Sequence, residues 1–161
     1  MNDLMTLLAI VALLGTAVIG GVFFAFSSFV MKALARVPSP EGIAAMQSIN
    51  VVVLNPSFLG AFTGTAFIAL LVAALAIKEW STPSAPFFLA GALLYLAGTF
   101  LVTGLGNVPL NNRLAAVSAA DPEAVPIWAH YLERWTTLNT VRTAAAIAAT
   151  SAFLAGLLQD Y

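Results

Sequence analysis

The chain has 161 residues, of which 61% are hydrophobic and only 8% are charged. Soluble domains carry roughly 25% charged residues, so this composition cannot build a surface that faces water, and we expect an integral membrane protein. The formal net charge of −1 implies no nucleic-acid partner. The absence of cysteine excludes disulfides, thiolate metal sites and cysteine nucleophiles.

Long uncharged runs predict membrane spans. A membrane helix needs about 20 mostly apolar residues, and the expected spans are 4–31, 58–77, 86–105 and 138–158. The first run lacks a basic leader and is longer than the apolar part of a signal peptide, so it is expected to be retained. Helices satisfy their backbone hydrogen bonds internally in lipid, so the expected fold class is all-α, with one domain over residues 1–161.

Two long connections join these spans, and each begins with a helix-start pattern. Ser39-Pro-Glu and Asp121-Pro-Glu would place an N-cap residue, a proline at N1 and an acid in the first turn. The expected polar helices cover about 40–55 and 122–137, and the second runs on into the fourth span. Both end in Leu-Asn, which favours two related helical hairpins packed as a four-helix bundle. The alternative is chance similarity between alanine-rich helices.

Basic residues predict the orientation in the membrane. All of them except Lys78 lie at the two long connections. Cytoplasmic loops carry the excess of lysine and arginine, so the long connections are expected in the cytoplasm and both termini outside, in the cytoplasmic membrane of a bacterium. Gly60 and Gly64 form a G-x-x-x-G pattern that is expected to support tight helix packing. A homo-oligomer, or a scaffold subunit that binds partner helices, is left open.

A stripe of aromatic and polar residues is the most unusual feature of the chain. Its members recur every three or four residues and would share one helical face. They are Trp128, Tyr131, Trp135, Asn139 and Arg142. Such a face would suit a flat aromatic ligand that carries oxygens. The alternative is an interfacial aromatic belt with an arginine that snorkels toward the headgroups.

The end of the third span supplies further amides. Asn107 and Asn111 are four residues apart on a helix that is expected to continue past Pro109. Amides at membrane depth need partners, so Asn107, Asn111 and Arg113 are expected to face the same cavity as the stripe. The alternative is a polar helix end, at which asparagines cap carbonyls freed by the proline.

These two motifs together carry a resemblance to a known family. Gly-Asn-Val-Pro-Leu-Asn-Asn at 106–112, followed by Trp-x-x-Tyr-x-x-x-Trp-x-x-x-Asn-x-x-Arg at 128–142, resembles the anthrone oxygenase-like family of small membrane proteins. The resemblance covers nearly the whole chain. It implies a cofactor-independent oxygenase that acts on anthrone-like polyketides with dioxygen. The matching positions are Asn107, Pro109, Asn111, Trp128, Trp135, Asn139 and Arg142.

The implied reaction suggests roles for these side chains. Loss of an activated C–H proton from an anthrone leaves an anion that can reduce dioxygen, so the protein needs a base, a partner for the enolate oxygen and a dry slot. His130 is the candidate base, and Arg142 with Asn139 or Asn107 could stabilise the oxygen. Flat walls for the slot are expected from Trp128, Tyr131 and Trp135.

His130 also has a competing interpretation. On a helix it lies about 200° from Trp128 and one turn before Arg134, so it could belong to a solvated surface cluster. Tyr131 or Arg142 would then be the better candidate for proton handling.

Cofactors and partners follow from the same residues. One histidine, no cysteine and no carboxylate pair within a span disfavour a metal site, and no cofactor is expected. The expected partners are a small aromatic or hydrophobic molecule and the lipid bilayer. The alternative function is a non-catalytic protein that binds or moves a quinone or a lipid.

Overall fold

Long helical rods dominate the computed structural model, which describes residues 3–160. The first rod joins α1 (Asp3–Ala25), the π-helical segment η1 (Phe26–Val30) and α2 (Met31–Leu34), and the second is α4 (Pro56–Lys78). The third rod joins α5 (Ala85–Leu93), η2 (Leu94–Leu101), η3 (Thr103–Asn107) and α6 (Val108–Ala115). The fourth is α7 (Ala124–Leu157), which ends in the short η4 (Leu158–Asp160). Within residues 3–160, four helices are long and apolar enough to cross a membrane, so the chain is an integral membrane protein.

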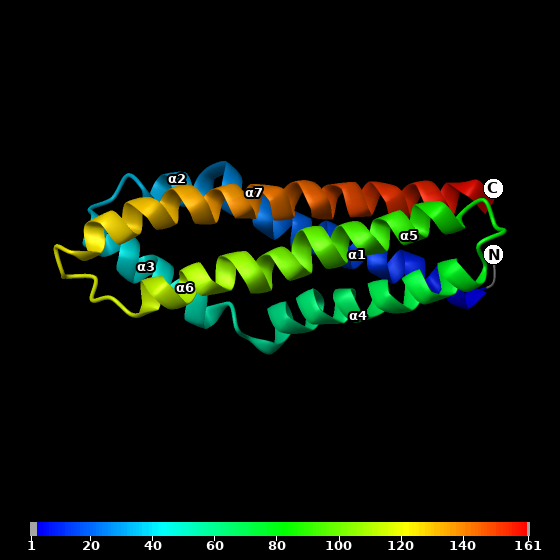
Figure 1. The fold of residues 1–161 in the computed structure, drawn as a ribbon, viewed down its shortest axis with the longest axis horizontal. Helices are drawn as coiled ribbons and strands as arrows, with labels where there is room; N and C mark the ends of the chain where they lie inside the picture. The colour runs from blue at the N-terminus through cyan, green and yellow to red at the C-terminus, as the bar shows by residue number, and fades with distance from the viewer. Residues whose placement is uncertain (1–2, 161) are drawn as a thin grey trace.

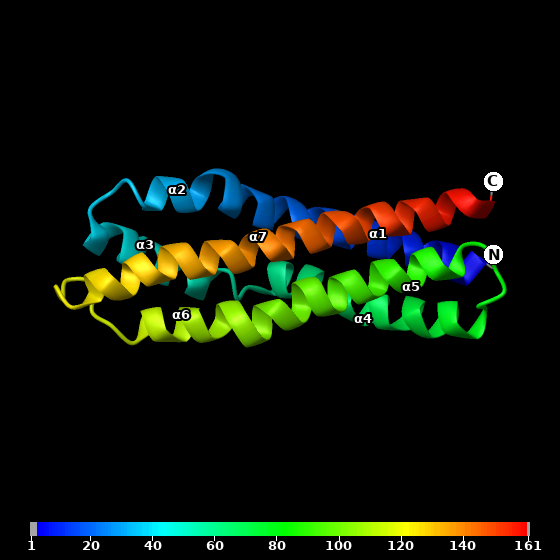
Figure 2. The same ribbon diagram turned by 45° about the horizontal axis from the view of Figure 1, so that its top comes forward.

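The four rods form a closed bundle. The first and third rods each pack against both α4 and α7, so every rod has two neighbours. The ends of the described chain and the 79–84 turn lie at one end of the bundle, and the long connections lie at the other (Figure 1). Here α3 (Ser39–Val52) packs against α2, α6 and α7. Figure 2 shows α7 running the full length of the molecule. The all-α four-helix bundle predicted from the sequence is confirmed.

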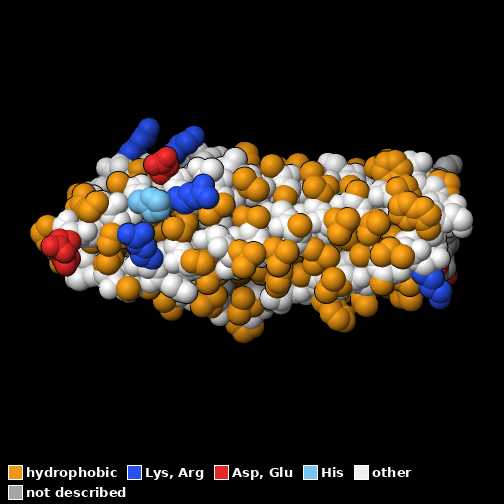
Figure 3. Space-filling model, in the orientation of Figure 1, with side chains coloured by type: hydrophobic (Ala, Val, Ile, Leu, Met, Phe, Trp, Pro, Cys, Tyr) orange, Lys and Arg blue, Asp and Glu red, His pale blue; other side chains and the backbone are white. Residues whose placement is uncertain are grey.

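The surface of the bundle has two distinct zones. Large apolar side chains are exposed along the rods, including Leu14, Phe67, Leu93 and Leu154. Charged side chains gather mainly at the end that holds the long connections (Figure 3). Such an apolar belt would be unfavourable in water, whereas in a bilayer it would contact the apolar lipid chains. We call the end with the long connections the polar end.

Phenylalanines and small residues interlock in the apolar core. Phe88 packs over Gly156 so closely that a Cβ atom there would lie 2.5 Å from the ring, and Phe153 packs over Gly91, where a Cβ atom would make a tight contact of 3.1 Å. The contact between the third rod and α7 uses the same device, since a Cβ at Gly98 would lie 2.5 Å from the Cβ of Ala145. Small residues thus set the spacing between these helices.

Replacing Gly98 with leucine is therefore expected to push the third rod away from α7 and to destabilise the bundle by about 1–3 kcal/mol, as overpacked cores do. Thermal unfolding in detergent, followed by circular dichroism, measures the effect. Gly64→Leu is the matched control, because no atom lies within 4 Å of a Cβ built at Gly64. Equal melting temperatures for the two variants would show that Gly98 does not set this spacing.

Several sequence-based boundaries need correction. The polar helix expected from 122 begins two residues later, at Ala124, and α7 runs on into the fourth span as expected. Asp121 is not an N-cap: its carboxylate accepts the backbone N–H of Glu123 in the turn before α7. Ser39 is the first residue of α3 and makes no capping hydrogen bond. Asn55 does cap α4, since its Oδ1 accepts the N–H of Phe58 at 2.9 Å.

The G-x-x-x-G pattern also behaves differently from the expectation. A Cβ atom at Gly60 or Gly64 would meet nothing within 4 Å. The close packing expected of this pair is therefore not used between the rods of this chain. The helices approach closely at other glycines, among them Gly15, Gly98 and Gly156.

Candidate functional site

The aromatic and polar stripe of α7 faces the interior of the bundle. All five of its members are buried, and the shared face predicted from their spacing is confirmed. Arg142 is only 3% exposed, so the alternative of an arginine that snorkels to the headgroups is wrong. The stripe has two parts, an aromatic stack near the polar end and a guanidinium cluster deeper in the bundle.

The aromatic stack is built around Tyr131. Its ring lies between those of Trp128 and Trp135, with centroid separations of 5.7 and 5.9 Å. The Tyr131 hydroxyl and the Trp135 Nε1–H both donate to Oδ1 of Asn111, at 2.8 and 2.9 Å. The Tyr131 oxygen also accepts a hydrogen bond from Nδ2 of Asn50 at 3.3 Å. One amide oxygen of the third rod thus fixes two rings of α7.

These rings fill the space between one another. The slot expected among Trp128, Tyr131 and Trp135 would open only if a flat guest displaced part of the stack. Asn107 and Asn111 do share a face toward α7, since Nδ2 of Asn107 donates to the carbonyl of Trp135 at 3.2 Å. Neither side chain caps a carbonyl freed by Pro109, so that alternative is wrong. Their roles in ligand binding stay predictions.

Arg142 is surrounded by neutral groups. Its NH2 group donates to Oδ1 of Asn139 at 2.7 Å, and its NH1 group donates to Oγ1 of Thr103 at 3.0 Å. The guanidinium carbon lies 4.0 Å from the centroid of the Phe23 ring and 5.2 Å from that of Trp135. Aromatic faces and oxygen dipoles stabilise a cation in this way. Within residues 3–160, the Arg142 guanidinium has no carboxylate partner.

Asn139 ties this cluster to the first rod. Its Nδ2 donates to the carbonyl of Phe23 and to Oγ of Ser27, both at 2.7 Å. Ser27 lies in η1, and Thr103, the partner of Arg142, begins η3. π-helical turns within α-helices are often found at functional sites. Here two of them bring hydroxyl groups to the middle of α7.

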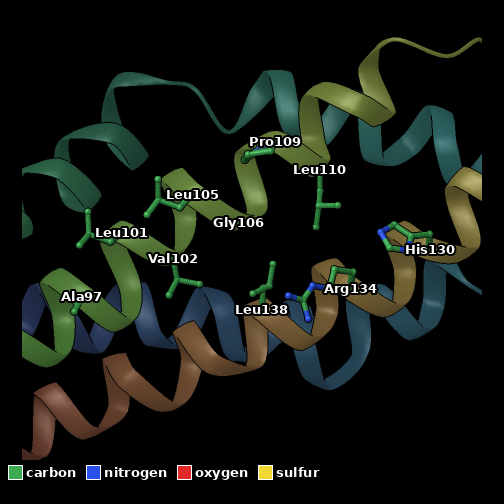
Figure 4. Close-up of a pocket in the computed structure, with 10 residues that line it drawn as sticks. All are labelled: Ala97, Leu101, Val102, Leu105, Gly106, Pro109, Leu110, His130, Arg134 and Leu138. Atoms are coloured by element: carbon green, nitrogen blue, oxygen red, sulfur yellow. The ribbon is translucent and has the colours of Figure 1, made fainter.

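A groove runs along the outer side of the contact between the third rod and α7. It has a volume of about 540 Å³, and Figure 4 shows its lining side chains on both elements. Two basic side chains, His130 and Arg134, project from α7 toward its polar end, and the rest of the lining is apolar. The lining residues are Ala97, Leu101, Val102, Leu105, Gly106, Pro109, Leu110, His130, Arg134 and Leu138.

Gly106 brings the two walls of this groove together. A Cβ at this position would lie 2.9 Å from Cδ1 of Leu138. The next residues in sequence, Asn107 and Asn139, belong to the buried polar groups behind the groove. The groove and the buried cluster are therefore neighbouring features of one helix contact.

The predicted site residues divide between the two features. His130 is exposed, faces away from the stripe and borders the groove, whereas Tyr131, Asn139 and Arg142 lie inside the bundle. Arg113 is exposed, so the expectation that it joins the buried amides is wrong. Within residues 3–160, no three histidine, cysteine or acidic side chains gather closely enough to hold a metal ion.

Sequence reasoning missed several partners in the site. Nothing in the sequence distinguishes Ser27 and Thr103, because hydroxyl groups in apolar spans usually bond their own helix. Asn50 has a second polar residue, Gln47, one turn earlier on α3. Asn50 bonds Tyr131 of α7, and Gln47 donates to the carbonyls of Leu114 and Val117. A search for polar residues three or four apart on α3 would have found this pair.

Comparison with known proteins bears on the same region. Residues 53–152 match the family model described as anthrone oxygenase. The matched segment includes α4, the whole third rod and most of α7, and therefore Asn107, Asn111 and the stripe from Trp128 to Arg142. No curated protein and no solved structure shows a match to the chain.

Proposed function

We propose that this chain, which belongs to the anthrone oxygenase family, is an oxygenase. In the proposed reaction, a CH₂ group opposite a ring carbonyl becomes a second carbonyl. Two hydrogens leave that carbon, one atom of dioxygen enters, and the other atom leaves as water. The observation that best supports this proposal is the groove, because the only histidine of the chain, His130, borders it.

The groove suits a lipophilic, flat substrate with an acidic oxygen at one end. Its volume of about 540 Å³ lies within the roughly 300–1,000 Å³ typical of small-molecule pockets. Apolar side chains line most of its length, while His130 and Arg134 border it near the polar end. A ring system dissolved in the bilayer could enter from the side and present its oxygens to the two basic groups.

The chemistry needs one base and one cation. We assign the proton from the CH₂ group to the imidazole of His130. Arg134, one helical turn away, would stabilise the enolate oxygen that results. The electron-rich carbon then transfers one electron to dioxygen, and the two radicals combine to form a C–O bond. Loss of the second C–H proton and cleavage of the O–O bond then give the new carbonyl and hydroxide, which becomes water on taking up the proton that His130 had removed.

The buried residues would act from behind the groove. The Arg142 cation, held by Asn139 and Thr103, adds positive potential on the inner side of Leu138 and thereby favours the developing anion. Tyr131 and the two tryptophans, fixed by Asn111, would hold α7 in register with the third rod. In this proposal Arg134 stabilises the enolate oxygen directly, Arg142 adds a second positive charge from inside the bundle, and Tyr131 is a positioning residue.

We further propose that the polar end of the bundle faces the cytoplasm. The basic residues exposed at this end are Lys32, Arg36, Arg113 and Arg134. Lys78 is the last residue of α4 and lies at the opposite end of the bundle (Figure 1). This asymmetry agrees with the positive-inside rule for a protein of the cytoplasmic membrane. The proposed substrate would then reach His130 from the bilayer at the cytoplasmic side.

Oxygen uptake by the protein in lipid nanodiscs, with anthrone as substrate, tests the proposal. Quinone should form faster than without protein, with one dioxygen consumed per quinone. Leu101→Trp, which fills the groove, should slow turnover about tenfold or more, equivalent to 1.4 kcal/mol of activation free energy. Leu93→Trp is the control, because Leu93 has nearly the same exposure, 54% against 53%, but does not line the groove.

Two results would count against this function. Quinone formation no faster than in protein-free nanodiscs would remove the oxygenase assignment. Saturable anthrone binding without oxygen uptake would instead support the alternative of a non-catalytic binding protein. Equal rates for Leu101→Trp and Leu93→Trp would show that the groove is not the site of reaction.

A further inference from the structure

Among residues 3–160, two buried side-chain atoms have no hydrogen-bond partner. They are Nε of Arg142 and Oδ1 of Asn107, on side chains that are 3% and 1% exposed. Buried polar atoms are almost always paired, because an unpaired one loses its hydration without replacement. An unpaired donor on a cation and an unpaired acceptor on an amide at the same helix contact therefore call for an occupant.

Both side chains approach the same part of α7. Asn107 bonds the carbonyl of Trp135, and Thr103, one turn earlier in η3, accepts a hydrogen bond from Arg142. Side chains on a helix lean toward its N-terminus, which brings the Arg142 guanidinium back to the level of Asn139 and over the Trp135 ring. The two unpaired atoms thus belong to one interface, between η3 and α7.

The chemistry of the pair selects the ligand. The Nε–H of Arg142 can donate a hydrogen bond from a cation whose partners, Asn139 and Thr103, are neutral. Oδ1 of Asn107 can accept a hydrogen bond. The matching ligand is a small monoanion with a charged atom and one attached hydrogen. We propose that the η3–α7 interface binds such a species, the hydroxide that leaves when the O–O bond of the substrate peroxide breaks in the neighbouring groove.

The position of the interface supports this assignment. Gly106 and Leu138 line the groove, and the residues that follow them in sequence, Asn107 and Asn139, line the buried cluster. Arg142 belongs to that cluster through its hydrogen bond to Asn139, so its cation lies on the inner side of the helix contact that forms the groove. The role in turnover rests on the proposed oxygenase function, whereas binding of the anion does not.

Binding is tested without turnover by thermal unfolding under anaerobic conditions with sodium hydrosulfide, a monoanion with one S–H group. The chain has no cysteine, so hydrosulfide has no thiol or disulfide to react with. The melting temperature of the wild-type protein should rise and saturate, compared with sodium chloride at the same ionic strength. Asn107→Asp should abolish this rise, because its carboxylate occupies Arg142. Asn112→Asp, the same change at an exposed neighbour, should retain it.

Turnover provides the second measurement. Asn107→Asp should lower kcat about tenfold or more relative to Asn112→Asp, because the hydroxide that leaves during O–O cleavage loses one hydrogen bond to a charged group. A hydrosulfide response without any turnover would uphold the anion site and reject the oxygenase function. A wild-type response equal to that of chloride, or one retained in Asn107→Asp, would overturn the site. If Asn107→Asp does not fold, Arg142→Lys, which keeps the charge but lacks Nε–H, should likewise lose the response, and a retained response would overturn the site.

Discussion

Replacing His130 with glutamine is expected to slow quinone formation by a factor of about 10²–10⁴, the contribution of a positioned general base. Glutamine preserves the polarity and approximate size of the side chain but cannot take up a proton. His130 borders the groove and is exposed, so its replacement should leave the bundle intact. Initial rates of oxygen uptake at saturating anthrone in nanodiscs measure the effect.

Two controls separate chemistry from a general effect on the protein. Glu133→Gln changes an exposed neighbour on α7 that does not line the groove, so its rate should match the wild type. Added imidazole should restore part of the rate of His130→Gln, because a free base can enter the open groove. A wild-type rate for His130→Gln would move the base to Tyr131 or Arg142, the alternatives that the sequence left open.

Replacing Trp135 with alanine should have the largest effect on stability, a loss of about 3–5 kcal/mol, as for other buried tryptophans. The change removes the ring that stacks on Tyr131, packs at a tilt against Phe26 and lies beside Arg142. It also removes one of the two donors to Asn111. Denaturant unfolding in mild detergent measures the free energy.

Trp80→Ala is the matched control, because the Trp80 side chain is 58% exposed at the opposite end of the bundle. Its free energy of unfolding should stay within about 0.5 kcal/mol of the wild type, as for most surface changes. Similar losses for the two variants would mean that the aromatic stack does not hold α7 against its neighbours.

The four spans were predictable because their main determinant is local. Each needs only a long uncharged run, and 58–77 agrees closely with α4 (Pro56–Lys78). The helix of the third span was expected to continue past Pro109, beyond the predicted span end at 105, and the third rod does so. Pro109 falls in the first turn of α6, where its missing N–H breaks no hydrogen bond, so the rod continues to Ala115.

The shared face of the stripe was also predictable, since helical spacing alone determines it. Its partners were not, because they come from other rods. Ser27 and Thr103 reach α7 through η1 and η3, and no local pattern indicates where a helix widens into a π-helical turn. The groove depends on the gap between two helices, and sequence spacing on α7 shows only that His130 faces away from Trp128.

The origin of the inserted oxygen shows directly whether this protein is an oxygenase. Protein in nanodiscs is supplied with anthrone and ¹⁸O₂ in unlabelled water, and the quinone is examined by mass spectrometry. We expect one ¹⁸O atom in the quinone formed by the wild type, and almost no labelled quinone with His130→Gln. Quinone that carries oxygen from water, or label that appears equally without the protein, would contradict this expectation.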